Sequence, residues 1–264
     1  MAAAMLVVAC GAQGGGKSKM EKGDASKIES VKESVAVQYD YRIVGEYPHS
    51  TNSYTQGLQY VDGVMWEGTG QEGDSHLQRI DLKTGKRTIL ASLPANEFGE
   101  GITHYKERIY QLTWLSNKAY VYNKEGKTLK TISYEGEGWG ITTDGERLFM
   151  SDGTPVIRVV DADSFEMLET IPVTIDGRSL NYINELEWVD GSIWANVYIS
   201  EVVVEIDPST GRVKGYVDLS PLRRLLVDNP EAEALNGIAY NSATGNFYVT
   251  GKDWKSIFEI EIYK

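Results

Sequence analysis

Apolar and polar residues alternate in short runs along residues 40–264, and turn-forming residues separate most of the runs. One pair of runs flanks Val61-Asp62-Gly63, and another flanks Val189-Asp190-Gly191. Alternation with a period of two, interrupted by Gly, Asp and Asn, is the signature of antiparallel β-hairpins. Further hairpin patterns cover residues 77–90, 119–132, 156–171 and 202–217. The pattern therefore predicts an all-β chain made of units of four short antiparallel strands.

Each unit opens with the same short phrase, in which a variable residue precedes a position that is usually Gly and then Leu or Ile. The phrases are Gln56-Gly57-Leu58, Glu100-Gly101-Ile102, Trp139-Gly140-Ile141, Asn184-Glu185-Leu186 and Asn236-Gly237-Ile238. Their variable positions are 44, 39, 45 and 52 residues apart. A repeat of this length, built of strands, is typical of a β-propeller with one blade in each repeat.

Five repeats predict a five-bladed β-propeller over residues 40–264. The fifth unit ends one strand short, at residues 257–264, and residues 41–47 can supply the missing strand. An N-terminal strand that closes the last blade leaves no long open sheet edge. The longest step between repeats contains residues 219–234, where Ser220 followed by Pro221 is a helix-start signal. We therefore expect one short helical insertion there.

The variable positions of the repeat indicate a functional site. If the phrases open equivalent strands, these five side chains stand in one ring around the propeller axis. The following strand of three units adds one residue each at a matching place near the same rim. The candidate pocket comprises Gln56, Glu100, Trp114, Trp139, Asn184, Tyr198, Asn236 and Lys252.

This set combines one carboxylate, one ammonium group, several amides and aromatic walls. A carboxylate walled by indoles is partly desolvated, which raises the pKa of Glu100 and suits it to acid–base chemistry. The sequence has no GxSxG nucleophile motif, and its three histidines lack metal-ligand spacing. One of them, His104, lies four residues after Glu100 and is a remote candidate for the central channel.

Charge and the N-terminal residues limit the partners and the location. The formal net charge of −12 and the lack of a basic stripe exclude nucleic acid as a partner. The single cysteine, Cys10, follows Val7-Val8-Ala9 in an arrangement that looks like a bacterial lipobox. We expect residues 1–39 to be a lipoprotein-type signal and flexible tether. The catalytic domain, residues 40–264, would then be lipid-anchored in the bacterial cell envelope, periplasmic or associated with the outer membrane; the alternative is an incidental cysteine.

Eight short motifs follow one another along residues 40–264. They are YTQGL (54–58), FGEGIT (98–103), LTW (112–114), GWGITTDG (138–145), SDGT (151–154), NELEWVDGSIWAN (184–196), LNGIAY (235–240) and VTGK-x-W (249–254). Together they resemble the plant and bacterial type of glutaminyl-peptide cyclotransferase, or glutamine cyclotransferase. The resemblance implies a five-bladed propeller that converts the N-terminal glutamine of a peptide or protein to pyroglutamate and releases ammonia. It implies a metal-free enzyme without an organic cofactor, and we expect a monomer.

The resemblance also implies roles for single residues. The glutamate of the FGEG motif, here Glu100, is the general acid/base in that family. The asparagine of NELE and the lysine of TGK, here Asn184 and Lys252, bind or polarise the amide carbonyl. The expected substrate contacts are Gln56, Trp114, Trp139, Tyr198 where the plant proteins have Trp, and Asn236, which also suits a turn.

Two other functions stay open at this point. Glu100, Asn184 and Asn236 carry the oxygen ligands that Ca²⁺ prefers, so a calcium-dependent lactonase-like hydrolase is one alternative. A non-catalytic propeller that serves as a binding module is the other. Structural roles are expected for Trp66, Trp188 and Trp194, which would pack between blades, and for Asp152, which would form a turn.

Overall fold

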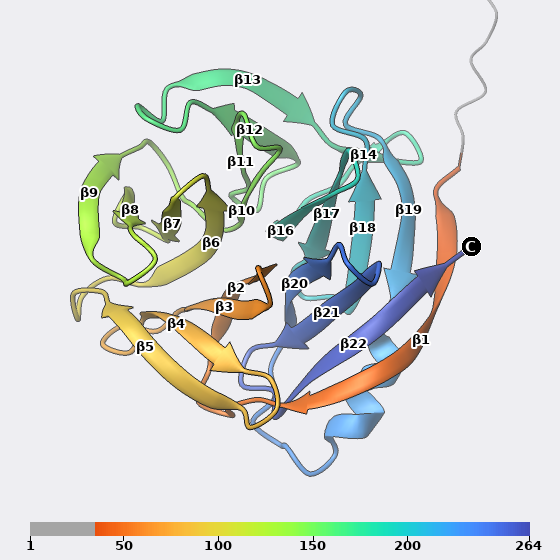
Figure 1. The fold of residues 1–264 in the computed structure, drawn as a ribbon. Helices are drawn as coiled ribbons and strands as arrows, with labels where there is room; N and C mark the ends of the chain where they lie inside the picture. Colours follow the sequence, from red (N-terminus) through yellow and green to blue (C-terminus); the bar gives the residue numbers. More distant parts are fainter. Residues whose placement is uncertain (1–34) are drawn as a thin grey trace, which may run out of the picture. The chain divides into compact units, whose positions relative to one another are not determined.

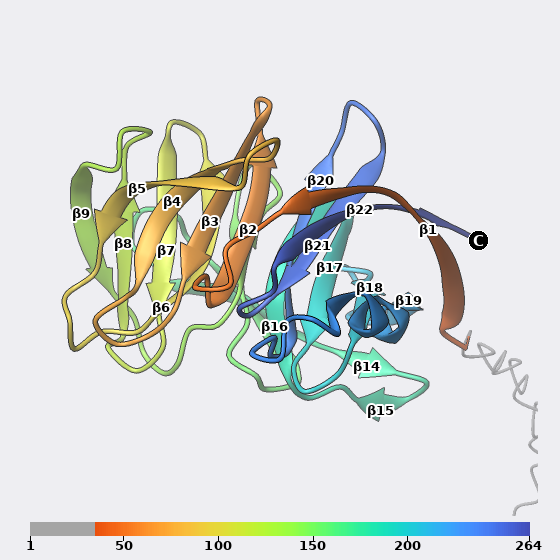
Figure 2. The ribbon, with the colours of Figure 1, turned by 90° about the horizontal axis from the view of Figure 1, so that it is seen from below.

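The computed structural model describes residues 35–264, and their regular structure is almost entirely β-strand. Figures 1 and 2 show the strands grouped into sheets around a common centre. Three antiparallel sheets have four strands each, in chain order. They are β2 (Thr55–Val61), β3 (Val64–Thr69), β4 (His76–Asp81) and β5 (Lys86–Ser92); β6 (Gly99–Tyr105), β7 (Arg108–Thr113), β8 (Lys118–Tyr122) and β9 (Thr128–Ser133); and β10 (Ile141–Thr143), β11 (Leu148–Met150), β12 (Val156–Val160) and β13 (Met167–Pro172). Units of four short strands, as the alternation predicted, are therefore present.

The C-terminal half adds an eight-stranded sheet in the order β16-β17-β18-β19-β1-β22-β21-β20. Its strands are β16 (Ile183–Val189), β17 (Ser192–Val197), β18 (Val202–Ile206), β19 (Val213–Asp218), β20 (Leu235–Asn241), β21 (Asn246–Gly251), β22 (Ser256–Tyr263) and β1 (Val37–Pro48). A small ribbon of β14 (Thr174–Ile175) and β15 (Arg178–Ser179) precedes it.

The N-terminal strand β1 lies beside the C-terminal strand, as Figure 1 shows. It pairs with β22 in antiparallel register, from Asp40 with Tyr263 to Pro48 with Ser256. Its first residues, Val37–Tyr39, pair in parallel with β19. Because the strand begins at Val37, three residues of the predicted tether range 1–39 belong to the sheet.

The repeated glycine of the phrases is required where the first strands of neighbouring sheets meet. A Cβ atom on Gly57 would lie 2.4 Å from the backbone nitrogen of Ile102, and one on Gly140 would lie 2.1 Å from the carbonyl oxygen of Asn184. Both distances are far below van der Waals contact. The phrase therefore repeats because the inner strands β2, β6, β10, β16 and β20 contact one another closely at the same level.

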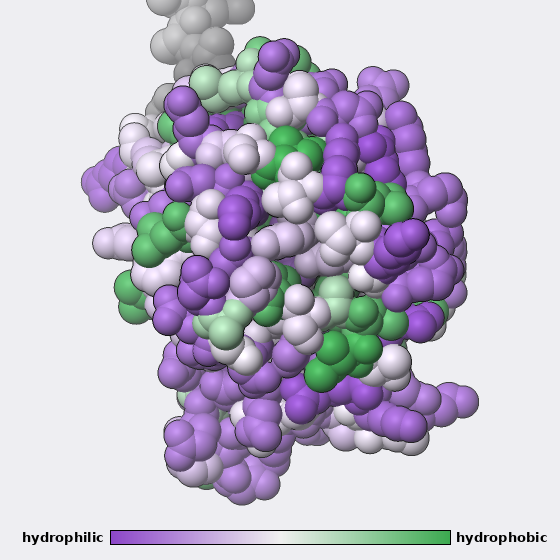
Figure 3. All heavy atoms as spheres, turned by 90° about the vertical axis from the view of Figure 1, so that its left-hand side faces the viewer, coloured by the Kyte–Doolittle hydropathy of each residue, from purple (hydrophilic) through white to green (hydrophobic). Residues whose placement is uncertain are grey.

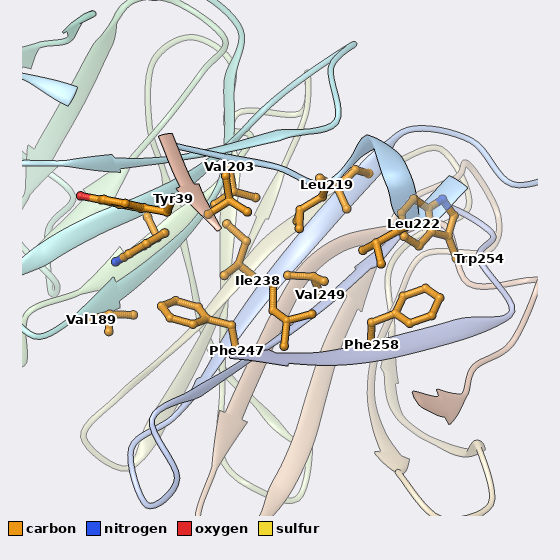
Figure 4. Packing of buried hydrophobic residues seen from close by; sticks show 14 of the residues in the cluster. Tyr39, Val189, Val203, Leu219, Leu222, Ile238, Phe247, Val249, Trp254 and Phe258 are labelled. Atoms are coloured by element: carbon orange, nitrogen blue, oxygen red, sulfur yellow. The ribbon is translucent and has the colours of Figure 1, made fainter. Parts of the chain in front are cut away.

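The helical insertion is present as the 3-10 helix η1 (Ser220–Leu226), with proline in its first turn. Figure 4 shows Leu222 of this helix near Trp254 and Phe258 in a buried cluster that extends to Phe247. Full burial of a leucine or phenylalanine side chain contributes about 1.5–3 kcal/mol. The insertion thus closes one side of the core and holds the chain that follows β21.

The three tryptophans with a predicted structural role are packing residues. Trp194 lies 4.7 Å from Phe247, ring centre to ring centre, and Trp188 stacks on Phe149 at 5.3 Å. Trp66 is buried. The face in Figure 3 is mainly hydrophilic with scattered hydrophobic groups, which is ordinary for a protein surface. Residues 35–264 contain no helix with the length and apolar character needed to cross a membrane.

Candidate active site

A cavity of about 190 Å³ opens at the end of the sheets where the first strands begin and the second strands end. Gln56, Glu100 and Asn184 reach it from the first residues of β2, β6 and β16. Antiparallel pairing brings the residues that follow β7, β17 and β21 to the same end. The cavity is lined by Tyr54, Gln56, Phe98, Glu100, Trp114, Trp139, Asn184, Tyr198 and Lys252. All the predicted pocket residues except Asn236 are in this group.

Two of the lining aromatic residues, Tyr54 and Phe98, were missed by the sequence reasoning. Each stands two positions before a variable residue of the phrase, Gln56 or Glu100, and residues two apart on an extended chain share a face. The ring centre of Phe98 lies 6.0 Å from that of Tyr54 and 5.8 Å from that of Trp114, both edge to face. Extending the repeat by two residues would have found this part of the wall.

Glu100 is the acidic group of the cavity, and only 4% of its surface is exposed. Burial raises the pKa of its carboxyl group well above the usual range, and the charge of Glu137 adds to the effect. Lys252 and Gln56 act in the opposite direction. A carboxyl group with a raised pKa binds and releases a proton closer to neutral pH, which is the property a general acid/base needs.

Lys252 is the basic group of the cavity and is equally buried. Burial lowers its pKa, while the charges of Glu100, Glu233 and Asp253 oppose that shift. Its Nζ lies 4.7 Å from the ring centres of both Tyr54 and Tyr198, so two aromatic faces stabilise the ammonium.

The segment after helix η1 holds the backbone of Lys252. The Lys252 N–H donates to the carbonyl of Ala234 at 3.0 Å, and the Glu233 N–H donates to the carbonyl of Lys252 at 2.8 Å. The Glu233 carboxylate also accepts from the Tyr54 hydroxyl at 3.0 Å. The helical insertion therefore sets the position of a pocket residue as well as packing against the core.

Asn184 carries an unused polar atom at the cavity. Its side chain is buried, and its Oδ1 has no hydrogen-bond partner among residues 35–264. A buried acceptor without a partner costs about 1–3 kcal/mol. A ligand that binds this side chain therefore breaks no protein hydrogen bond to Oδ1.

Asn236 does not reach the cavity, contrary to its place in the predicted pocket. Its side chain is fully buried behind β2, where Nδ2 donates to the carbonyl of Thr55 at 3.0 Å and to Oε1 of Gln56 at 3.1 Å. Because this bond engages the side-chain oxygen of Gln56, the Gln56 NH₂ group is the part of the side chain that can donate to a ligand. Asn236 thus orients a pocket residue, because its side chain turns toward the neighbouring strand.

Glu137 was also missed, although it lies two residues before Trp139. Its Oε2 accepts the indole N–H of Trp114 at 2.7 Å and that of Trp139 at 2.9 Å. The indole of Trp139 in turn meets Tyr198 edge to face, with ring centres 5.7 Å apart. Extending the repeat by two residues would have pointed to Glu137 as well, but not to its two indole partners, since those depend on two sheets coming together.

The three histidines lie outside the cavity. His104 is partly buried and lies against Trp66, its Nδ1 lies 2.8 Å from Oε1 of Gln59, and desolvation lowers its pKa to about 4. His49 lies in a buried polar cluster with Glu67, and His76 lies beside Asp74. Within residues 35–264, no three His, Cys, Asp or Glu side chains converge in a way that could hold a metal ion.

Asp152 forms the predicted turn. Its Oδ1 accepts the backbone N–H and the hydroxyl group of Thr154, at 3.1 and 2.5 Å. The carboxylate is therefore engaged in local structure and is not among the cavity residues.

The fold and the site together define a class: an all-β protein with a small aromatic pocket that holds a buried carboxyl group of raised pKa beside an ammonium group. Comparison with known proteins agrees with this class. The family model described as glutamine cyclotransferase matches residues 17–262. The chain belongs to the glutamine cyclotransferase family.

Individual relatives match over most of the chain. A glutaminyl-peptide cyclotransferase from Arabidopsis thaliana is 36% identical over 228 residues, which are 84% of this chain and 71% of the relative. The crystal structure of a glutaminyl cyclase from Myxococcus xanthus is 36% identical, covers 86% of this chain and 98% of its own, and superposes with a TM-score of 0.79. A nidogen/laminin complex structure, at 17% identity and a TM-score of 0.51 over 76% of this chain and 73% of that chain, is similar in fold alone.

Proposed function

We propose that this chain is a glutaminyl-peptide cyclotransferase, an enzyme that converts the N-terminal glutamine of a peptide or protein to pyroglutamate with release of ammonia. The observation that carries the proposal is Glu100, a buried carboxyl group with a raised pKa, beside Lys252 in a small aromatic cavity. The cavity has room for one terminal residue, while the rest of a peptide extends into solvent. Membership of the glutamine cyclotransferase family supports the same reaction.

The reaction needs one proton shuttle. The α-amino nitrogen of the substrate attacks its own γ-carboxamide carbon, and Glu100 accepts the proton that the nitrogen loses. Glu100 then returns this proton to the amide nitrogen, the C–N bond breaks, and ammonia leaves with the lactam closed. The step is intramolecular, so holding the side chain in a folded pose removes part of the barrier.

The other cavity residues supply orientation and charge stabilisation. Lys252 and the NH₂ group of Asn184 donate to the oxygen of the tetrahedral intermediate, where negative charge develops. Gln56 contacts the substrate through its NH₂ group, because its oxygen is bound by Asn236. The aromatic walls exclude water and fit the aliphatic part of the glutamine side chain, and the protein acts as a monomer without a metal or cofactor.

The scaffold of this enzyme is a five-bladed propeller. In this description the eight-stranded sheet is two blades, β16–β19 and β20–β22 with β1, joined along β1. The antiparallel pairing of β1 with β22 supports closure of the last blade by the N-terminal strand. The five repeated phrases support the count.

The N-terminal residues carry a separate part of the proposal. Cys10 lies outside the described residues 35–264, so the lipid anchor and the envelope location rest on the lipobox-like sequence. If Cys10 is acylated, the wild-type protein partitions into detergent and incorporates labelled fatty acid, and a Cys10→Ala variant does neither. Equal labelling of both proteins would refute the anchor.

The function is tested by a coupled ammonia assay with a glutaminyl dipeptide, with and without a chelator. We expect stoichiometric ammonia and pyroglutamyl product, at the same rate in both conditions. Loss of the activity with the chelator would favour a calcium-dependent hydrolase, and absence of ammonia would favour a non-catalytic binding module.

A further inference from the structure

One carboxylate outside the cavity links two of its walls. The same oxygen of Glu137 accepts the indole N–H groups of Trp114 and Trp139, at 2.7 and 2.9 Å. Trp114 follows β7 and Trp139 precedes β10, so the two indoles come from different sheets. An indole has a single polar hydrogen, and a bond to it restricts the rotation of the ring about its side-chain bonds.

The segment that carries Glu137 is itself held by side chains. Arg158 of β12 donates to the carbonyl oxygens of Glu135, at 2.7 Å, and of Glu137. Asn117 donates to the carbonyl oxygen of Gly136 at 2.6 Å. Arg158 also lies 3.6 Å from the Asp152 carboxylate, between Nε and Oδ2. The position of the Glu137 carboxylate is therefore set by several bonds before any substrate binds.

We propose that Glu137 is a positioning residue that orients both indoles of the pocket wall and places its carboxylate directly behind that wall. The proposal rests on the proposed cyclotransferase function for its kinetic part. Glu137 does not line the cavity and needs no contact with the substrate.

The charge of Glu137 affects the pKa of Glu100 in a definite direction. Like charges disfavour ionisation, so the charge raises the pKa of Glu100 in the same direction as burial does. The other charged or titratable groups that act with Glu100 are Lys252, which lowers its pKa, and Tyr134, whose own pKa is raised mainly by burial and further by the charge of Glu100. Removal of the Glu137 charge leaves the other two in place, so the pKa of Glu100 should fall.

Two substitutions separate orientation from charge. In Glu137→Gln, the amide oxygen can still accept from the indoles, but the charge is gone. In Glu137→Ala, both the bonds and the charge are gone. The matched control is Glu135→Gln, because Glu135 lies two residues away, is exposed and bonds no indole.

The first measurement is the NMR signals of the indole N–H groups in the free protein, assigned with Trp114→Phe and Trp139→Phe. We expect both signals to move strongly in Glu137→Ala, less in Glu137→Gln and hardly at all in Glu135→Gln. Unchanged signals in Glu137→Ala, with the protein folded by near-ultraviolet circular dichroism, would overturn the orienting role. This measurement does not depend on the reaction.

The second measurement is kcat against pH with a glutaminyl dipeptide. We expect the acidic limb to move to lower pH in Glu137→Gln with KM within about twofold of wild type, and KM to rise about tenfold in Glu137→Ala, the equivalent of roughly 1.4 kcal/mol. An acidic limb that coincides with that of Glu135→Gln would overturn the charge role. If the wild-type protein forms no pyroglutamate, the proposed function fails, while the NMR result still decides the orienting role.

Discussion

Glu67 and Glu100 are both buried glutamates beside a basic side chain, yet their surroundings shift the carboxyl pKa in opposite directions. The Glu67 carboxylate accepts from Thr55 and Gln78, each at 2.6 Å, and lies 3.0 Å from Nε2 of His49. These contacts overcome burial and lower its pKa. Glu100 lies at a cavity with far fewer donors, so burial dominates and its pKa is raised.

The number of hydrogen-bond donors around a buried carboxyl group decides whether it has a structural or a chemical role. A buried carboxylate with a full set of donors stays ionised and joins the strands that provide them. Here the cluster joins β2, β3 and β4 to His49, whose Nδ1 lies 2.8 Å from the carbonyl oxygen of Trp254. A buried carboxyl group with few donors has a raised pKa, closer to the neutral pH at which it can exchange a proton during a reaction.

The same substitution at the two sites is the most direct test, and its largest effect is expected at Glu100. Glu100→Gln keeps the size of the side chain and removes the proton shuttle, so kcat should fall by about two to four orders of magnitude. The measurement is ammonia release from a glutaminyl dipeptide. Turnover within tenfold of the wild-type rate would contradict the role of Glu100.

At Glu67 the change should act on stability. Glu67→Gln removes the charged partner of the buried His49, and breaking this buried pair should lower the free energy of unfolding by about 3–5 kcal/mol. The measurement is denaturant unfolding, with kcat of the folded protein within about threefold of wild type. Wild-type stability in this variant would show that the cluster is not a structural ion pair.

The pH dependence of kcat should reflect the ionisation of Glu100 and Lys252. The pKa of Glu100 is raised above 4.5 and that of Lys252 is lowered below 10.5. Activity should fall at low pH as Glu100 takes up a proton and at high pH as Lys252 loses one, giving a bell-shaped profile. In Lys252→Met the basic limb should disappear, whereas Lys86→Met, a change at an exposed lysine, should leave both limbs in place.

The smallest expected effect is a gain in stability at Glu100. Because its folded pKa is above the unfolded value, the folded state holds its proton longer, and stability decreases as pH rises from 4.5 through the raised pKa. Glu100→Gln should therefore stabilise the protein at neutral pH by about 1 kcal/mol. The gain should vanish below pH 4.5, and an equal gain at all pH values in thermal unfolding would contradict this origin.

The contribution of the Glu67–His49 pair to stability depends on pH in a different way. The lowered pKa of Glu67 makes its contribution present above 4.5 and lost as pH falls through the folded value. The raised pKa of His49 makes its contribution present below 6.5 and lost as pH rises through the folded value. Stability from this pair is therefore greatest between pH 4.5 and 6.5, the two unfolded pKa values, and decreases on either side as the pH approaches the folded values.

One position of the repeated phrase shows what the repeat alone can and cannot predict. Gly57, Gly101, Gly140 and Gly237 share one position of the phrase, but the fourth phrase has Glu185 there. The Glu185 carboxylate is buried and accepts the backbone N–H of Leu58 at 3.3 Å and of Ile238 at 2.8 Å. The sequence marked Glu185 as an exception to the repeat, and only the structure shows that it joins the first and last inner strands.

The sequence alone determined the all-β architecture, the four-stranded units, the helical insertion and most of the pocket. Period-two alternation and a repeated phrase are local signals, and equivalent positions in a repeat meet at equivalent places in space. The same logic, extended by two residues, would have included Tyr54 and Phe98.

The tertiary structure decided what each polar group meets. Asn236 shares the repeat position of Gln56 but turns behind it, Glu137 joins two indoles from different sheets, and Glu67 and Glu100 differ in pKa although both are buried glutamates. A side chain's partners, and hence its pKa and its role, come from strands that are distant in sequence. No periodicity within one strand records those partners, because hydrogen bonding and desolvation act between strands.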